Sequence, residues 1–178
     1  MAEAVGHQAG VVVAAVAVAG DAMAALSPSL LFVYGTLRPQ LIGQAATSPP
    51  RELVAGLQPA GRATVCGLLV DLGAYPGFLP ASTGGPAASG TVGPAPRVVG
   101  DLLEVNAEQL AILDDYEECG GDDPLYIREV ITAARHADGG LVACWIYRYC
   151  RDTAGARPIT SGDYAQHLGV ADPGFPHS

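Results

Sequence analysis

The chain has 178 residues, of which 49% are hydrophobic and 15% charged, and its formal net charge is −9. This length suits one folded domain with a proper core, and the composition excludes an intrinsically disordered chain. All nine basic residues are scattered arginines, so the chain lacks the basic stripe of a nucleic-acid or anionic-membrane binder. Because it has no lysine, Schiff-base chemistry is excluded as well.

The Ala/Val-rich residues 1–28 are interpreted as an extension of uncertain structure, followed by one domain at 29–170 and a tail at 171–178. Their apolar run is shorter than the roughly 20 residues of a membrane span. No basic residue before Arg38 supplies the positive region of a secretory signal. An extra strand or helix on the core is the alternative, and Met23 is a candidate for the native start.

The cysteines show no C-x-x-C spacing and indicate no secreted disulfide framework. We expect reduced thiols, with Cys66 and Cys144 buried in apolar runs, and a cytoplasmic protein. The histidines pair at no ligand spacing, so no metal site is predicted.

Several apolar segments predict β-strands. They are residues 30–34, 63–70, 98–105, 126–134 and 141–149. In the last of these, alternation places Ala143, Trp145, Tyr147 and Tyr149 on one face.

The connections between these strands also have recognisable signals. Residues 138–140 predict a hairpin turn, residues 71–77 a pair of turns, and the low-complexity residues 81–96 a flexible surface loop. Ser161 can cap a short final helix that runs to Leu168.

One clear helix is predicted at residues 107–118, because Asn106 and Gln109 have capping-box spacing. On a helical wheel the apolar stripe consists of Leu110, Ile112, Leu113 and Tyr116. Glu117 falls inside this stripe, whereas the other acidic residues, Glu108, Asp114, Asp115 and Glu118, fall on the polar side.

An inward carboxylate is costly to ionise, so the pKa of Glu117 is expected to be raised and suited to proton transfer near neutral pH. An ion pair of Glu117 with Arg128 or Arg148 is the structural alternative. Glycine in the segment Tyr34-Gly35-Thr36-Leu37 allows a turn whose backbone N–H groups point outward. Such a turn can bind an anion or a developing oxyanion, although glycine after a strand is often only a turn.

Residues 31–37, Leu-Phe-Val-Tyr-Gly-Thr-Leu, resemble the YGTL/YGSL signature of the gamma-glutamylcyclotransferase-like family, which includes the AIG2-like and gamma-glutamylamine cyclotransferase branches. Six further segments resemble motifs of this family in the same order: 63–76, 99–103, 113–117, 126–128, 143–147 and 159–164. The resemblance implies an α+β fold, a small mixed β-barrel with a few flanking helices.

The resemblance also implies a metal-independent enzyme without a cofactor, which releases 5-oxoproline and a free amine from a small gamma-glutamyl substrate. Glu117 corresponds to the general acid/base of the family. The motif residues Tyr34, Gly35, Thr36 and Leu37 correspond to its substrate-binding loop. Tyr147 is a candidate for a supporting hydroxyl, with core packing as the alternative. We expect a monomer or weak dimer.

This chain departs from the family pattern in two places. Glu118 and Cys119 stand where the family usually has glycine after the motif glutamate, and residues 38–44 lack the usual glycine and asparagine. Two other functions stay open: a non-catalytic binding or regulatory module on the same fold, or an amide hydrolase that uses the same carboxylate.

Overall fold

The structure is a computed structural model that describes residues 28–43, 49–81 and 95–170. Several predictions fall outside these residues: the N-terminal extension at 1–27, the start at Met23, the central part of the 81–96 loop, and the C-terminal tail.

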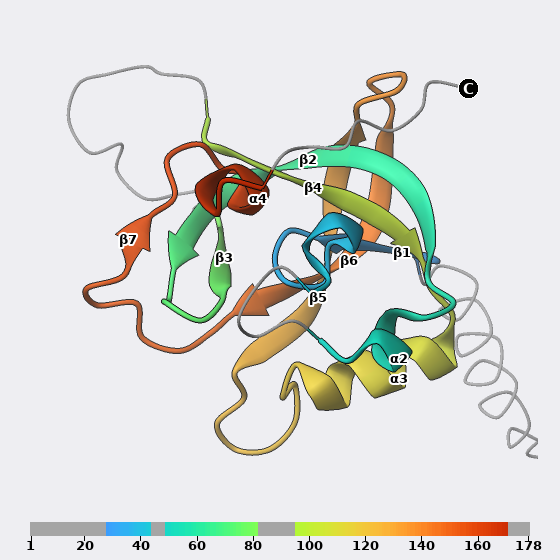
Figure 1. The fold of residues 1–178 in the computed structure, drawn as a ribbon, viewed down its shortest axis with the longest axis horizontal. Coiled ribbons are helices and arrows are strands. Elements are labelled where there is room, and N and C mark those ends of the chain that lie inside the picture. The colour runs from blue at the N-terminus through green and yellow to red at the C-terminus, as the bar shows by residue number, and fades with distance from the viewer. Residues whose placement is uncertain (1–27, 44–48, 82–94, 171–178) are drawn as a thin grey trace, which may run out of the picture.

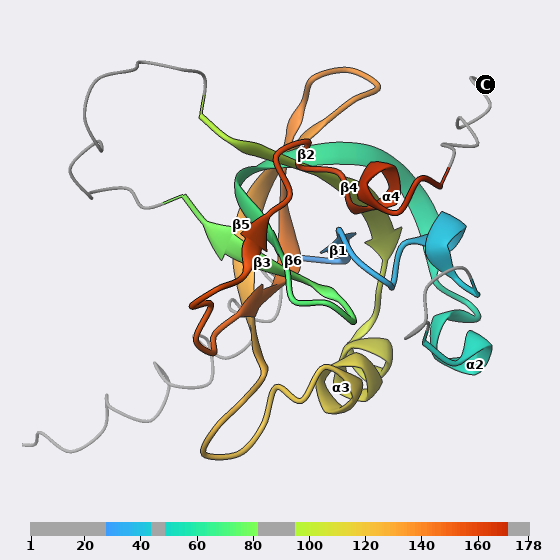
Figure 2. The same cartoon turned by 60° about the vertical axis from the view of Figure 1, so that its left-hand side comes forward.

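The described residues form a closed mixed β-barrel, as expected (Figures 1 and 2). Its strands are β1 (Leu30–Val33), β2 (Gln58–Asp71), β4 (Arg97–Glu104), β5 (Tyr126–Arg135) and β6 (Leu141–Tyr149). Around the barrel the order is β2-β4-β1-β6-β5, and the pairing of Ala63 and Thr64 with β5 closes the ring. The sheet is mixed because β1 runs parallel to β6 and antiparallel to β4.

Two short strands extend the far end of β2. They are β3 (Pro76–Pro80) and β7 (Arg157–Pro158). The interpretation of residues 76–77 as a turn is wrong, because Pro76 begins β3. Proline is acceptable at the first residue of a strand, where its missing N–H leaves no ladder bond unmade.

The described helical elements are η1 (Pro39–Leu41), α2 (Arg51–Val54), α3 (Ala107–Tyr116) and α4 (Tyr164–His167). In both views α3 and α4 lie on opposite sides of the barrel (Figures 1 and 2). The predicted cap of the last helix is wrong. Asp163, not Ser161, accepts the N–H of Ala165 at 2.9 Å.

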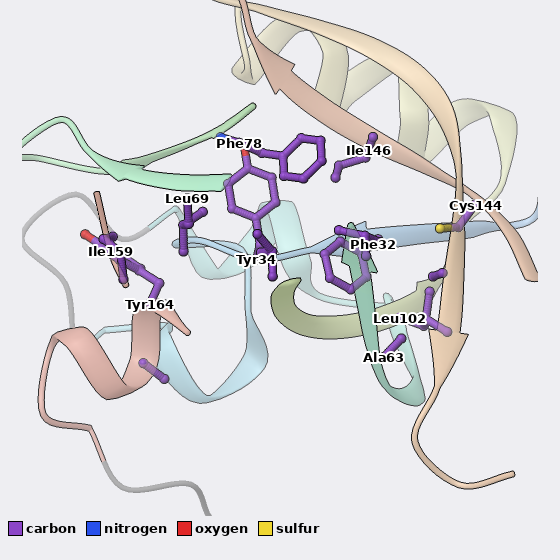
Figure 3. Packing of buried hydrophobic residues seen from close by; sticks show 14 of the residues in the cluster. Phe32, Tyr34, Ala63, Leu69, Phe78, Leu102, Cys144, Ile146, Ile159 and Tyr164 are labelled. Carbon is purple, nitrogen blue, oxygen red and sulfur yellow. The ribbon is translucent and has the colours of Figure 1, made fainter. Parts of the chain in front are cut away.

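The core has two parts, because β1 is buried on both faces. Phe32 and Tyr34 point into what we call the barrel cluster, which includes Phe78 and reaches α4 (Figure 3). Leu31 and Val33 point into the α3 cluster, which lies under helix α3. This double burial explains why the segment reads as one continuous apolar run.

All four cysteines are free. Cys144 is buried as predicted, but Cys66 is exposed, because it lies on the outer face of β2. No helix in the described part of the chain has the length and apolar character that a membrane crossing requires.

Candidate active site

Glu117 caps the carboxyl end of helix α3. Its backbone N–H donates to the Leu113 carbonyl at 2.9 Å. At the opposite end of the helix Asn106 and Gln109 form the predicted capping box, and the Asn106 side chain accepts the Gln109 N–H at 2.9 Å. Leu110 and Leu113 are buried against the barrel. These contacts fix the helix along one face and place Glu117 at the barrel end.

The predicted apolar stripe of this helix is only partly right. Ile112 is 58% exposed and Tyr116 is 38% exposed. The helix is short, ends at Tyr116 rather than at 118, and meets the barrel along the narrower stripe of Leu110 and Leu113. Asp114 is also not simply on the solvent side, because it bonds to two residues of the barrel wall.

The carboxylate of Glu117 is only partly exposed, and burial raises its pKa from the ordinary 4.5 to about 7. Among the described residues no hydrogen bond or ion pair to this carboxylate is present. Arg128 instead pairs with Asp114 at 2.8 Å, and Arg148 pairs with Glu129 at 3.0 Å. The ion-pair alternative for Glu117 is therefore wrong.

The loop that follows β1 brings backbone N–H groups to the same end of the barrel. The Arg38 N–H donates to the Gly35 carbonyl at 3.0 Å and closes a tight turn. Within the described residues, the N–H groups of Gly35, Thr36 and Leu37 donate to no other protein group. Three free N–H groups in succession can stabilise a carboxylate or an oxyanion.

The reason for glycine at position 35 differs from the one expected. Gly35 does not adopt a left-handed conformation. Instead, a Cβ atom there would lie 2.9 Å from Cγ of Pro76, the first residue of β3. Glycine is needed because β3 passes so close to the loop.

Tyr34 lines the site, but its hydroxyl is occupied within the core. It donates to the Tyr147 carbonyl at 2.7 Å and accepts the Phe78 N–H at 3.2 Å. Its ring packs beside that of Phe78, as Figure 3 shows, with 5.8 Å between the centroids. Burial raises the pKa of Tyr34 well above its ordinary value, so this phenol stays protonated.

Tyr147 joins the site to a polar network in the barrel wall. Its hydroxyl donates to the Asp114 carboxylate at 2.9 Å, and Arg128 pairs with the same carboxylate. The Arg128 guanidinium lies 4.4 Å from the centroid of the Trp145 ring, which is a cation–π contact. Tyr147 is only 3% exposed, so it both packs in the core and lines the site.

Glu117, the loop at residues 35–37 and Tyr147 all line one cavity of about 270 Å³. It brings together every predicted site residue: Tyr34, Gly35, Thr36, Leu37, Glu117 and Tyr147. The sequence reasoning missed other wall residues, namely Phe32, Val33, Tyr75, Pro76, Tyr116, Glu118, Leu125 and Tyr126. Tyr75 and Pro76 lie in a family-like motif, which is the signal that could have identified them.

Sequence reasoning also missed the anchor of the loop. Arg38 is fully buried, and its side chain bonds to Asp101 at 2.8 Å and to Asp163 at 2.7 Å. These partners come from β4 and from the cap of α4, so one arginine ties the loop to two distant elements. In the described part of the chain, no group of three or more His, Cys, Asp and Glu side chains is arranged to hold a metal ion.

Comparisons with known proteins point to one family. The family model described as "Gamma-glutamyl cyclotransferase, AIG2-like" matches residues 31–166. No curated protein matches the chain. An AIG2-like protein from Mus musculus has a similar structure, with a TM-score of 0.54 and 20% identity over 85% of this chain and 99% of that one.

Two bacterial structures are also similar. Protein ytfP from Escherichia coli has a TM-score of 0.50 and 26% identity, over 78% of this chain and 97% of that one. YkqA from Bacillus subtilis has a TM-score of 0.52 and 22% identity over 78% of this chain. The present chain spans 40% of the length of YkqA. The mouse protein and YkqA are less than 25% identical to this chain, so their similarity shows only that the fold is shared.

Proposed function

The chain belongs to the gamma-glutamyl cyclotransferase, AIG2-like family, and from this premise we propose that it releases 5-oxoproline from a gamma-glutamyl substrate. One observation carries the proposal. A single cavity holds a carboxyl group without a protein partner, Glu117, and three free N–H groups in the loop at residues 35–37. A proton acceptor and an oxyanion site are the two parts that this acyl transfer needs.

In the proposed reaction, the α-amine of the substrate attacks its own γ-carbonyl carbon. A new C–N bond closes a five-membered ring and leaves a tetrahedral oxyanion, which the N–H groups of Gly35, Thr36 and Leu37 stabilise. The old C–N bond then breaks and releases the amine. Because the attack is intramolecular, the protein mainly has to orient the substrate, and no water is consumed.

Glu117 moves the proton in this scheme. Its carboxylate accepts a proton from the attacking α-amine and then donates it to the nitrogen of the leaving amine. A pKa of about 7 suits both steps, since the acid and base forms are both populated near neutral pH. Tyr147 supports the cavity wall next to Glu117 through its bond to Asp114.

The replacement Glu117→Gln tests the proposal, because it keeps the size of the side chain but cannot transfer the proton. We expect the release of 5-oxoproline to fall by about 10²–10⁴-fold, while the far-UV circular dichroism stays unchanged. The matched control is Asp115→Asn, an exposed acid of the same helix, which should keep wild-type activity. Turnover near the wild-type rate in Glu117→Gln would contradict the mechanism.

The same assay separates the two alternatives. An amide hydrolase would release glutamate, and in ¹⁸O-labelled water this glutamate would carry the label. The proposed cyclisation instead forms 5-oxoproline without the label. A binding module would retain a gamma-glutamyl ligand without forming either product. The cytoplasmic location and the monomeric or weakly dimeric state stay predictions.

A further inference from the structure

A second groove opens on the surface of the barrel, between strands β2 and β5. Its volume is about 540 Å³, and none of its wall residues lines the cavity of Glu117. Among the described residues β2 and β5 pair only at Ala63 and Thr64, and the groove lies where this pairing stops. The seam of the barrel therefore leaves part of the sheet surface open, outside the proposed active site.

The wall of this groove is apolar and exposed. Val130 is 52% exposed and Leu141 is 73% exposed, and Cys66 is exposed beside them. Single exposed apolar side chains are ordinary in proteins, but these three line one groove. Arg97 is the one charged residue of the described wall. The groove thus suits an uncharged, apolar occupant.

Helix α3 covers the other end of the same sheet face. Val130 pairs with Trp145, so both side chains point to one side of the sheet, and Tyr147 lies two residues further along that face. The Tyr147 hydroxyl donates to Asp114 of α3. In both views the turn between β5 and β6 lies at the opposite end from α3 (Figures 1 and 2). Leu141 begins β6 next to this turn, so the helix leaves it uncovered.

The N-terminal part of the chain joins the barrel beside this face. The Trp145 Nε1–H donates to the Pro28 carbonyl at 2.9 Å. Strand β1 runs parallel to β6, with Leu31 opposite Trp145, so the start of β1 lies toward the start of β6, where Leu141 is. Four residues of strand, about 13 Å, separate Trp145 from Leu141. The residues before Pro28 are therefore tethered close to the groove.

The sequence before Pro28 contains one segment with the chemistry that the groove requires. Residues 10–20 read Gly-Val-Val-Val-Ala-Ala-Val-Ala-Val-Ala-Gly, without a charged or polar side chain. Residues 21–27 connect this segment to Pro28 and reach about 23 Å when extended. This reach exceeds the distance along β6 to Leu141. A short covalent link also raises the effective concentration of the segment at the groove.

We propose that residues 10–20 occupy the groove between β2 and β5 and pack their valine side chains against Cys66, Val130 and Leu141. Removal of apolar surface from water on both sides drives this contact. The inference does not rest on the proposed function, because the groove and the Glu117 cavity have separate walls. The N-terminal extension is then a docked part of the domain.

Alkylation of Cys66 in the full chain tests the proposal. Iodoacetamide is added, and modification of Cys66 is followed by peptide mass spectrometry. The double variant Val13→Glu/Val16→Glu places charges in the segment, and we expect it to raise the alkylation rate of Cys66 about tenfold or more, because the segment leaves the groove. The control is Ala2→Glu/Ala4→Glu, which adds the same charge outside residues 10–20 and should keep the wild-type rate.

The groove side is tested in the same assay. Leu141→Glu places a charge in the exposed wall and should also raise the alkylation rate of Cys66. Its control is Ile112→Glu, because Ile112 is 58% exposed on α3 and lies outside the groove. A rate at Cys66 that neither Val13→Glu/Val16→Glu nor Leu141→Glu changes would overturn the inference, whatever else fills the groove.

Disulfide cross-linking identifies the occupant directly. Val13→Cys, Val16→Cys and Ala17→Cys are oxidised one at a time, each as a mixture of ¹⁴N- and ¹⁵N-labelled chains. We expect at least one of them to form a disulfide with Cys66 within a single chain. Links only between ¹⁴N and ¹⁵N chains would place a second copy in the groove and overturn the inference, as would the absence of any link to Cys66.

Discussion

The protonation of Glu117 should govern the pH dependence of the proposed activity. The base form must accept the first proton, and burial raises the pKa of this carboxyl to about 7. We therefore expect kcat/KM to fall as the pH drops below about 7, and to level off above it. A pH profile of wild type and Asp115→Asn measures this. An inflection near 4.5, the ordinary value, would show a solvated carboxylate instead.

The same raised pKa predicts a change in stability with pH. Below 4.5 the carboxyl is protonated in both the folded and the unfolded chain. Between 4.5 and about 7 the unfolded chain ionises first, so wild type loses stability relative to Glu117→Gln, and above 7 the loss is constant. Urea unfolding at high pH should show the variant to be more stable by on the order of 1–3 kcal/mol. Equal stability at all pH values would contradict this burial penalty.

Gly35 should tolerate no side chain, because Pro76 lies where a Cβ would be. Gly35→Ala must push the loop away from β3, and we expect it to reduce kcat/KM by about tenfold or more, since misplaced loop N–H groups no longer meet the oxyanion. The control is Gly120→Ala, where a Cβ meets nothing within 4 Å. Similar kinetics for the two variants would show that the loop N–H groups are not part of the reaction.

At the scale of elements, Arg38 joins the site loop, β4 and the start of α4. Removing its side chain leaves the fully buried Asp101 without its closest cation. We expect Arg38→Met to destabilise the fold by about 3–5 kcal/mol, as for a broken buried ion pair, and to lower kcat/KM because the loop loses its anchor. Urea unfolding and steady-state kinetics measure the two effects.

The control for Arg38→Met is Arg135→Met. Arg135 pairs with Asp138 at 2.8 Å, but both side chains are substantially exposed. Its removal should change stability by less than about 1 kcal/mol. If the two variants lose the same stability, the buried network is not the anchor of the loop.

The elements differ in how well the sequence predicts them. Helix α3, its capping box and the strands β5 and β6 can be predicted from residues that are neighbours in the sequence. The first residues of β2 and the whole of β3 were not predicted. Both segments contain proline and glycine, and they become strands only because β4 and β2 lie beside them to supply hydrogen bonds.

At the scale of the whole molecule, closure of the barrel couples its two core clusters. Phe78 lies in the barrel cluster, whereas Trp145 packs against the α3 cluster. Because strand β1 contributes to both, we expect one cooperative transition. Phe78→Ala should lower stability by about 3–5 kcal/mol, and it should shift Trp145 fluorescence and far-UV circular dichroism equally. A fluorescence midpoint that stays at the wild-type value would show independent units.

Features that depend on residues near one another in the chain could be predicted from the sequence. Strand alternation, the capped helix and the inward position of Glu117 all follow from local periodicity, and the ordered motifs identified the family. The folded structure shows which side chains from distant segments meet. In it Glu117 has no arginine partner, and Arg38 is buried between Asp101 and Asp163. Glu118 has a left-handed backbone conformation and lies in the cavity wall. These outcomes depend on distant segments that closure of the barrel brings together, and no local pattern records them.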